Sequence, residues 1–209
     1  MSEGRLGEGG AIRWVIFDWG DVLVRYRPQG FVCLAQRLST GVEEVVAAIQ
    51  RQGLFQALLI GRAAPEEMSA RIEQVFGRQL SRADIAACFA GDVKEPMPGM
   101  FELVEVLSAR SVQLAMLSNT FFGHWDHLLR DPAYAPFAVP LASHVLGAAK
   151  PQRTIYRCAL AELDARPEEV VFWDDQQGHV DAARACGWQA YRFESAAQVK
   201  RRLAELGVL

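Results

Sequence analysis

The 209-residue chain lacks the features that direct a protein to a membrane or to nucleic acid. It has no apolar run near the roughly 20 residues that a membrane-spanning helix needs. Its formal net charge of −3 provides no excess of basic side chains for binding a nucleic-acid backbone. We therefore expect neither a membrane nor nucleic acid among its partners.

Cysteine is scarce, and the amino-terminal segment is polar. The four cysteines, Cys33, Cys88, Cys158 and Cys186, show no CxxC spacing, so we expect core thiols of a reducing compartment. Residues 1–10 are rich in glycine, lack the apolar core of a signal peptide and are predicted to form a disordered lead. Together these features predict a cytoplasmic protein.

The segment of residues 14–24, WVIFDWGDVLV, is the most informative part of the chain. Four β-branched or aromatic residues precede Asp18, as in a parallel strand that is covered on both faces. A buried strand has no packing use for an acid at its tip. In open α/β sheets, ligands bind at the carboxyl ends of the strands. Asp18 is therefore a candidate nucleophile or metal ligand.

Residues 26–95 have the pattern of a helical region in which no strand is predicted. Thr40 and Ser81 are candidate helix caps, and Pro65 suits the first turn of a helix. The segment of residues 95–99, EPMPG, is stiff and ends this region.

The remainder of the chain alternates between strand and helix. Strands are predicted at residues 113–117, 139–142, 170–173 and 189–193. Such alternation predicts the α/β class, with a Rossmann-like, doubly wound parallel sheet. We expect a core of residues 11–25 and 96–209, interrupted by an all-helical insertion of residues 26–95.

Polar side chains recur where the predicted strands end. Ser118 follows the strand at 113–117, and Asp174 and Asp175 follow the strand at 170–173. Lys150 lies in a loop that contains glycine. If these strands neighbour the one that ends at Asp18, the side chains meet in one crevice. Carboxylates, a hydroxyl and an ammonium suit a phosphate together with a divalent cation.

Four segments resemble, in order, the four motifs of the haloacid dehalogenase (HAD) superfamily. They are residues 17–24, 117–120, 150–151 and 172–175. The helical insertion resembles the cap that this superfamily places between its first and second motifs. The form Asp-x-Gly-x-Val-Leu, with Ser-Asn-Thr and Asp-Asp, is similar to a subgroup of small phosphatases that act on sugar phosphates.

The resemblance implies roles for the residues at the phosphoryl group. Asp18 would be the nucleophile that becomes an aspartyl-phosphate, and Ser118 and Lys150 would hold the phosphoryl group. Asn119 would contact the phosphoryl group or the leaving group. The implied substrate is a small phosphorylated metabolite, over which the cap closes.

The resemblance also implies a Mg²⁺ site. Its ligands would be Asp18, the backbone carbonyl of Gly20, and Asp175. Asp174 would be either a further ligand or a residue that orients the ligands.

Two positions depart from the pattern of the family. Most HAD phosphatases carry a second Asp two residues after the nucleophile, where it acts as the acid/base for the leaving group, and this chain has Gly20. Asp21 is adjacent, but successive side chains after a strand point apart. At His179, related sequences often carry Asp or Asn to support the metal site, which a neutral His could do by a hydrogen bond or by direct ligation. His124 follows Ser118 closely enough to line the site.

Several alternatives stay open at the level of sequence. A 2-haloacid dehalogenase uses a similar Asp nucleophile but needs neither Mg²⁺ nor an Asp-Asp pair. A phosphomutase depends on the acid/base that Gly20 lacks, and a binding protein without catalysis would accommodate Gly20. Arg25 and Arg62 are expected in solvent, with a second anion site as the alternative. The chain is expected to be a monomer or a homodimer.

Overall fold

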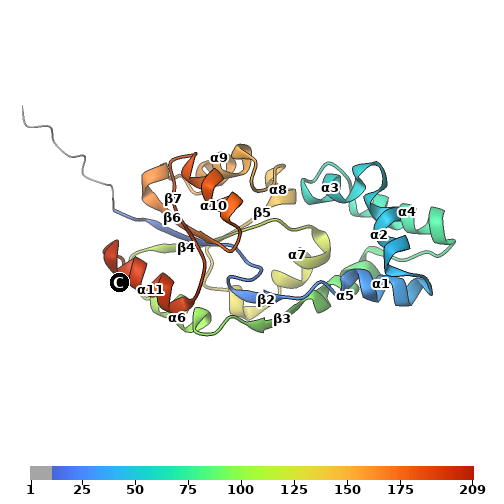
Figure 1. Cartoon of the computed structure of the whole chain (residues 1–209), viewed down its shortest axis with the longest axis horizontal. Helices are drawn as coiled ribbons and strands as arrows, with labels where there is room; N and C mark the ends of the chain where they lie inside the picture. The colour runs from blue at the N-terminus through green and yellow to red at the C-terminus, as the bar shows by residue number, and fades with distance from the viewer. Residues whose placement is uncertain (1–10) are drawn as a thin grey trace, which may run out of the picture.

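A five-stranded parallel sheet forms the centre of the structure, a computed structural model that describes residues 11–209 (Figure 1). The strand order is β5-β4-β1-β6-β7. The disordered lead predicted for residues 1–10 lies outside the described residues. The strands are β1 (Trp14–Phe17), β4 (Gln113–Ser118), β5 (Val139–Ala142), β6 (Val170–Asp174) and β7 (Gln189–Arg192).

Helices cover both faces of this sheet. On one face α6 (Met100–Ser108) and α11 (Ala196–Glu205) pack on Val15 and Phe17 of β1. On the other face α9 (Arg153–Glu162) and α10 (Gln177–Arg184) pack on its alternate residues, Trp14 and Ile16. Alternate residues of a strand point to opposite faces, so a strand covered on both sides is apolar throughout. This confirms the predicted α/β, doubly wound fold.

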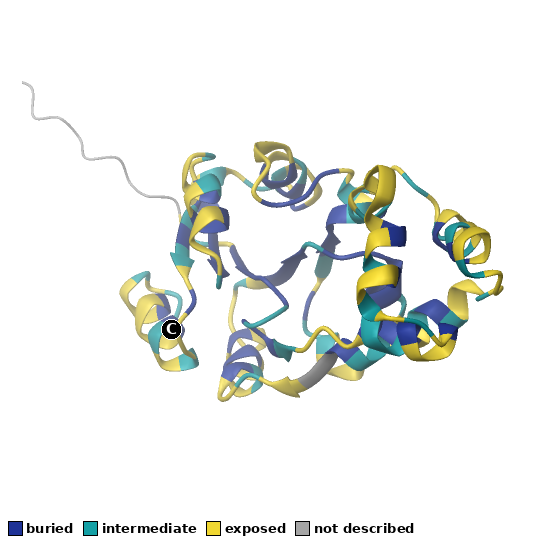
Figure 2. Cartoon of the chain, turned by 45° about the vertical axis from the view of Figure 1, so that its right-hand side comes forward, coloured by how far each residue is buried: buried dark blue, intermediate teal, exposed yellow. Residues whose placement is uncertain are grey.

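The helical part lies beside the sheet, at the right of Figure 1, and Figure 2 brings it forward. It has its own buried apolar cluster, which includes Leu34, Ile49, Met68 and Ile72. Phe121, which follows β4, belongs to the same cluster and joins the helical part to the core. The helices are α1 (Gly30–Leu38), α2 (Val42–Gln50), α3 (Leu54–Leu59), α4 (Pro65–Phe76) and α5 (Arg82–Phe89).

Two antiparallel strands connect the helical part to the core. They are β2 (Val24–Tyr26) and β3 (Val93–Pro96). The expectation that residues 26–95 contain no strand was therefore wrong at β3. The reason is that β3 is short, carries charged residues and is held by its partner β2, so its apolar pattern is too weak to be read alone.

Shorter elements complete the chain. Two α-helices follow strands: α7 (Phe122–Leu128) follows β4, and α8 (Ser143–Leu146) follows β5. Among the described residues, no helix combines the length and the apolar character needed to cross a membrane. The short 3₁₀ helices are η1 (Arg51–Gly53), η2 (Ala90–Asp92), η3 (Pro132–Tyr134) and η4 (Pro167–Glu169).

Of the two predicted helix caps, the structure confirms Ser81 and does not confirm Thr40. Ser81 caps α5, and its hydroxyl accepts a hydrogen bond from the Asp84 N–H, as predicted. Thr40 does not cap α2, because Gly41 occupies the N-cap position. The Thr40 hydroxyl instead donates to Glu44, within the first turn of that helix.

The cysteines differ from the expectation. Cys33 of α1 and Cys88 of α5 form a disulfide, whereas Cys158 and Cys186 are free thiols. The expectation of four thiols was therefore wrong for the first pair. These two residues are 55 positions apart, and only the packing of α1 against α5 brings their Cα atoms to 5.3 Å.

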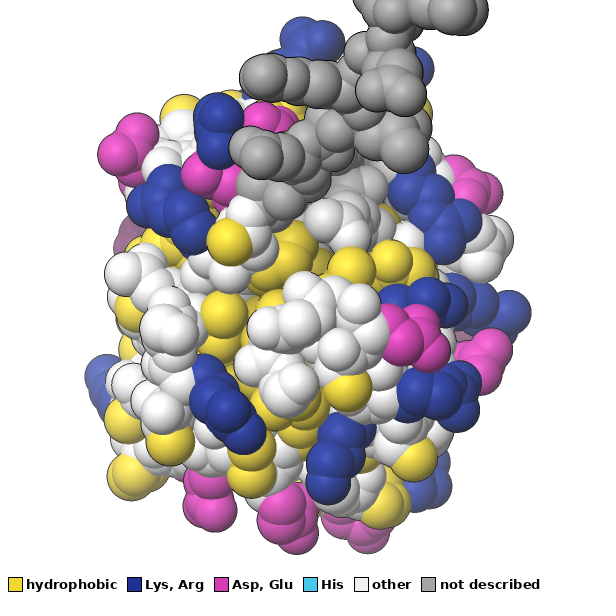
Figure 3. Space-filling model, turned by 90° about the vertical axis from the view of Figure 1, so that its left-hand side faces the viewer, with side chains coloured by type: hydrophobic (Ala, Val, Ile, Leu, Met, Phe, Trp, Pro, Cys, Tyr) yellow, Lys and Arg dark blue, Asp and Glu magenta, His cyan; other side chains and the backbone are white. Residues whose placement is uncertain are grey.

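The surface at the end away from the helical part has no single sign of charge. Figure 3 shows basic and acidic side chains around a strip of hydrophobic ones on this face.

Candidate active site

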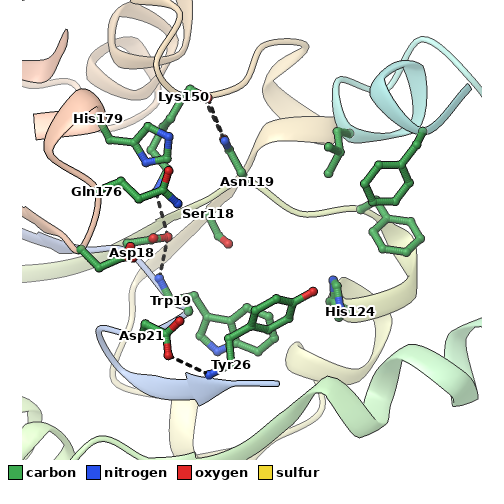
Figure 4. A pocket seen from close by; sticks show the side chains of 15 residues that line it. Asp18, Trp19, Asp21, Tyr26, Ser118, Asn119, His124, Lys150, Gln176 and His179 are labelled. Atoms are coloured by element: carbon green, nitrogen blue, oxygen red, sulfur yellow. Dashed lines mark hydrogen bonds and ion pairs between the residues drawn. The ribbon is translucent and has the colours of Figure 1, made fainter. Parts of the chain in front are cut away.

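The topology brings the predicted strand-end residues together. β1 lies between β4 and β6, and Phe17 is in register with Met116 on one side and Trp173 on the other. Asp18, Ser118 and Asp174 therefore lie side by side at the carboxyl edge of the sheet. A cavity of about 290 Å³ opens above this edge, and Asp18, Ser118 and Lys150 line it (Figure 4).

Lys150 is the centre of a buried ion cluster. Its Nζ lies 2.8 Å from Asp18 Oδ1 and 2.7 Å from Asp174 Oδ2, and it donates to the Leu117 carbonyl at 2.8 Å. The Lys150 side chain is fully buried. Among the lining residues of the described chain it is the only lysine or arginine. Arg25 and Arg62 do not line the cavity, so they form no second anion site there.

Asn119 holds the loop that carries Lys150. Its Nδ2 donates to the Lys150 carbonyl at 2.8 Å, and its Oδ1 accepts from the Lys150 N–H at 2.7 Å (Figure 4). Both ends of the amide therefore bind the backbone of this loop. This arrangement positions the ammonium over the end of the sheet, although Asn119 also lines the cavity.

Asp174 and Asp175 have different surroundings. Asp174 is fully buried, and its Oδ1 accepts from the Gln176 N–H and from His179 Nδ1, each at 2.9 Å. Its Oδ2 accepts from Lys150. Asp175 is partly exposed and lines the cavity. Asp175 is thus the acid with an accessible carboxylate, while Asp174 is engaged on both oxygens.

Three carboxylates meet at this point. Asp18, Asp174 and Asp175 each offer an oxygen atom, and these atoms lie within 4.8 Å of one another. Hard carboxylate oxygens in this number are suited to Mg²⁺. Lys150 is the one ammonium among them, so the cluster carries an excess of negative charge that a divalent cation would offset.

The electrostatics of the cluster agree with this description. Burial, opposed by Lys150 and aided by the nearby charge of Asp174, raises the pKa of Asp18 to about 6. Burial also raises the pKa of Asp174, but its bond to His179 and the charge of Lys150 outweigh burial and leave that pKa lowered. Burial lowers the pKa of Lys150, but Asp18 and Asp174 together leave it raised. Both shifts favour the charged forms of Lys150 and Asp174.

Other parts of the cavity wall are aromatic and apolar. Trp19 follows Asp18, and its Nε1 donates to the Tyr134 hydroxyl at 2.7 Å. Phe55 and Leu59 of α3 face the cavity from the helical part, together with Phe121. The amino-acid sequence alone does not mark these residues as lining the site, because side chains of this kind could as well belong to a core.

Tyr26 and His124 complete the cavity wall (Figure 4). Tyr26 lies at the end of β2, and its N–H donates to Asp21 Oδ1 at 3.1 Å. His124 lies on α7 and is buried. In the sequence, His124 was a candidate because it follows Ser118 by only a few residues. No signal in the sequence pointed to Tyr26.

The fold and the site are those of a hydrolase with a Rossmann-like core. The chain belongs to the haloacid dehalogenase-like hydrolases, because the model of that family matches residues 12–187. This confirms the resemblance seen in the four motifs.

One relative with a named activity agrees with this assignment. The chain is 22% identical over 204 residues to a D-ribitol-5-phosphate phosphatase of Bacteroides thetaiotaomicron, covering 92% of this chain and 97% of the relative.

Two solved structures share the fold. A predicted HAD-like family hydrolase from Porphyromonas gingivalis superposes with a TM-score of 0.76 at 24% identity, covering 93% of this chain and 98% of that one. A HAD family enzyme from Bacteroides thetaiotaomicron, in complex with magnesium and inorganic phosphate, has a TM-score of 0.74 at 21% identity. That comparison covers 88% of this chain and 96% of the other.

Proposed function

We propose that this protein is a Mg²⁺-dependent phosphomonoester hydrolase that acts on a small phosphorylated metabolite, such as a sugar phosphate, through an aspartyl-phosphate at Asp18. The observation that carries the proposal is the buried cluster in which Lys150 Nζ lies between Asp18 and Asp174, at 2.8 Å and 2.7 Å. Ser118 lines the same cavity. The similarity to a D-ribitol-5-phosphate phosphatase supports a polyol or sugar phosphate as substrate.

The donor set fits Mg²⁺. Asp18 and Asp175 would be ligands through carboxylate oxygens, and Gly20 through its backbone carbonyl, with Asp174 and its partner His179 orienting them. When bound, Mg²⁺ would neutralise charge on the phosphoryl oxygens.

The residues of the chain supply the remaining chemistry. The Asp18 carboxylate attacks phosphorus, and the ester oxygen leaves with the electron pair of the broken P–O bond. Ser118 donates a hydrogen bond to the phosphoryl group, and the Lys150 ammonium stabilises its negative charge. A water molecule then hydrolyses the aspartyl-phosphate, which releases phosphate and restores Asp18.

We further propose that residues 26–95 act as a cap that selects the substrate. Phe55 and Leu59 of α3 contribute an apolar wall to the cavity that the ion cluster also lines. A wall of this kind excludes water from the reacting groups and leaves room for a small organic group. A cavity of about 290 Å³ suits a metabolite and not a folded protein.

The contact between the cap and the core at Gly61 provides a test of this role. Gly61 follows α3 and has a φ of +65°, and a Cβ there would collide with the His144 carbonyl oxygen. Gly61→Ala is expected to push α3 away from the core. We expect KM for the substrate to rise about tenfold or more, because misplacement of a binding wall disturbs substrate positioning.

Gly77→Ala is the matched control, because Gly77 has a φ of +64° but no atom within 4 Å of the position of a Cβ. Both substitutions carry the backbone strain of a positive φ, roughly 1 kcal/mol or more. Only Gly61→Ala meets the core. Equal KM values for the two variants would contradict the proposed role of the α3 contact.

Hydrolysis of para-nitrophenyl phosphate, with Mg²⁺ and with a chelator, tests the proposed function. We expect turnover that requires Mg²⁺, disappears on chelation and returns when Mg²⁺ is added again. This substrate carries a good leaving group, so the measurement does not depend on an acid at position 20. Absence of turnover, or turnover indifferent to Mg²⁺, would overturn the proposal. Mg²⁺-independent halide release from a 2-haloacid would instead identify a dehalogenase.

A further inference from the structure

A further buried acid, Asp92, contacts the cavity-lining residue His124 and belongs to none of the four motifs. Its side chain is 1% exposed. Asp92 Oδ1 accepts hydrogen bonds from the N–H groups of Gln29 and Gly30, at the start of α1. Its Oδ2 lies 2.9 Å from His124 Nε2 and accepts from the Tyr26 hydroxyl at 3.4 Å. A carboxylate this buried is stable because each oxygen has partners.

His124 is held in one orientation by this carboxylate. The rings of Trp19, Tyr26, Phe89 and Phe121 surround it, with centroids 5.2–5.8 Å from the imidazole. Because Nε2 is bound to Asp92, Nδ1 is the ring nitrogen left for another partner. Among the side chains that the structure describes, which leave out those of residues 93 and 94, none forms a hydrogen bond to Nδ1, and His124 lines the cavity. A ligand in the cavity is therefore the available partner of Nδ1.

The side chain of Tyr26 connects this histidine to Gly20, where the family's acid/base is missing. A Cβ on Gly20 would contact the Cβ of Tyr26 at 3.4 Å, so the side chain of Tyr26 lies over the glycine. The Tyr26 ring is in turn 5.8 Å from that of His124. The Tyr26 side chain therefore contacts both the position of the missing acid at Gly20 and the imidazole of His124.

The other ionisable groups of the cavity are poor candidates for giving a proton to the leaving group. Tyr26 already donates its hydroxyl proton to Asp92, and burial together with the Asp92 charge raises the pKa of Tyr26. Asp21 accepts from the Tyr26 N–H. The remaining lining groups belong to the ion cluster or contact it: Asp18, Lys150, Asp175 and His179.

We propose that His124, oriented by Asp92, is the proton donor for the leaving group, in place of the acid absent at Gly20. The inference rests on the proposed phosphatase function. As the Asp18 oxygen forms its bond to phosphorus, the P–O ester bond breaks and its electron pair stays on the ester oxygen. The proton of His124 Nδ1–H passes to that oxygen, so an alcohol leaves and the imidazole becomes neutral.

The second half of the reaction restores the histidine. Neutral Nδ1 accepts a proton from the water that attacks phosphorus, as the bond from phosphorus to the Asp18 oxygen breaks. Phosphate leaves, Asp18 is again a carboxylate and His124 is again protonated. Asp92 keeps a proton on Nε2 of His124, so that Nδ1 is the nitrogen that exchanges its proton. Asp92 also stabilises the positive charge on the ring, as the acid of an Asp–His pair does.

Two esters of similar size test the proposal. Para-nitrophenyl phosphate releases a stable phenolate, whereas benzyl phosphate releases an alkoxide that needs a proton. General acid catalysis contributes about 10²–10⁴-fold. We therefore expect His124→Gln to lower kcat/KM for benzyl phosphate by about 100-fold or more and for para-nitrophenyl phosphate by less than about tenfold. His124→Phe, which suits the surrounding aromatic rings, is expected to show the same selective loss.

His127→Gln is the matched control, because His127 lies on the same helix but is exposed. It should leave both rates unchanged. Equal losses on the two esters in both His124 variants would show a structural or binding role and overturn the proposal. Wild-type turnover of para-nitrophenyl phosphate without turnover of benzyl phosphate would also overturn it, since no group would then protonate the leaving oxygen. If the wild type hydrolyses neither ester, the proposed function fails, and this inference with it.

Discussion

Turnover of para-nitrophenyl phosphate is expected to fall by about 10⁴-fold or more in the Asp18→Asn variant. An amide is a much weaker nucleophile than a carboxylate, so the covalent step is lost while the shape of the side chain is kept. The measurement is kcat at saturating Mg²⁺, beside the wild type. Turnover that survives the substitution would remove Asp18 from the role of nucleophile.

Thermal unfolding provides the control for this variant. Burial raises the pKa of Asp18 from 3.8 to about 6 in the folded protein, so the folded state holds this proton more tightly than the unfolded chain does. The resulting stabilisation is present at low pH and is lost as the pH rises to about 6. Asparagine stays neutral throughout. Without metal at pH 7, we therefore expect the Tm of Asp18→Asn to be at least that of the wild type, and a lower Tm would contradict this description of the cluster.

Lys150→Ala is expected to cost both activity and stability. The fully buried ammonium lies between Asp18 and Asp174, and its removal leaves two carboxylates without their counterion. Breaking a buried pair by removing one partner typically costs about 3–5 kcal/mol. We expect a loss of this size in the free energy of unfolding, measured by urea denaturation without Mg²⁺, together with loss of phosphatase turnover.

Two further variants separate this effect from a general loss of charge. Lys200→Ala removes an exposed lysine of α11 and should change the free energy of unfolding by less than about 0.5 kcal/mol. In an Asp18→Asn background, Lys150→Ala should cost less than it does alone, because one carboxylate has already been neutralised. Equal costs in the two backgrounds would show that Lys150 and Asp18 are not coupled.

The sequence by itself determined the sheet and the residues at its edge. Buried parallel strands must be apolar on both faces, so β1, β4 and β6 are visible as apolar runs. Polar residues that interrupt such runs, such as Asp18 and Ser118, stand out because packing cannot explain them. The order of the four motifs then predicted the family, and the family model confirms it.

Only the tertiary structure decided which partners each polar side chain has in its hydrogen bonds and ion pairs. Asp174 and Asp175 are neighbours in sequence, yet one is closed in by Lys150 and His179 and the other faces the cavity. The amide of Asn119 has the groups needed to bind a substrate, but both ends of this amide bind the backbone of Lys150.

Contacts between distant segments of the chain were likewise decided only by the tertiary structure. Cys33 and Cys88 meet because α1 packs on α5, and Asp92 reaches His124 because β2 and β3 pair at the base of the helical part. Local patterns record the period of a strand or a helix and the chemistry of a turn. The partner of a side chain depends on how those elements pack, which no local pattern contains, so these pairs became visible only in the folded chain.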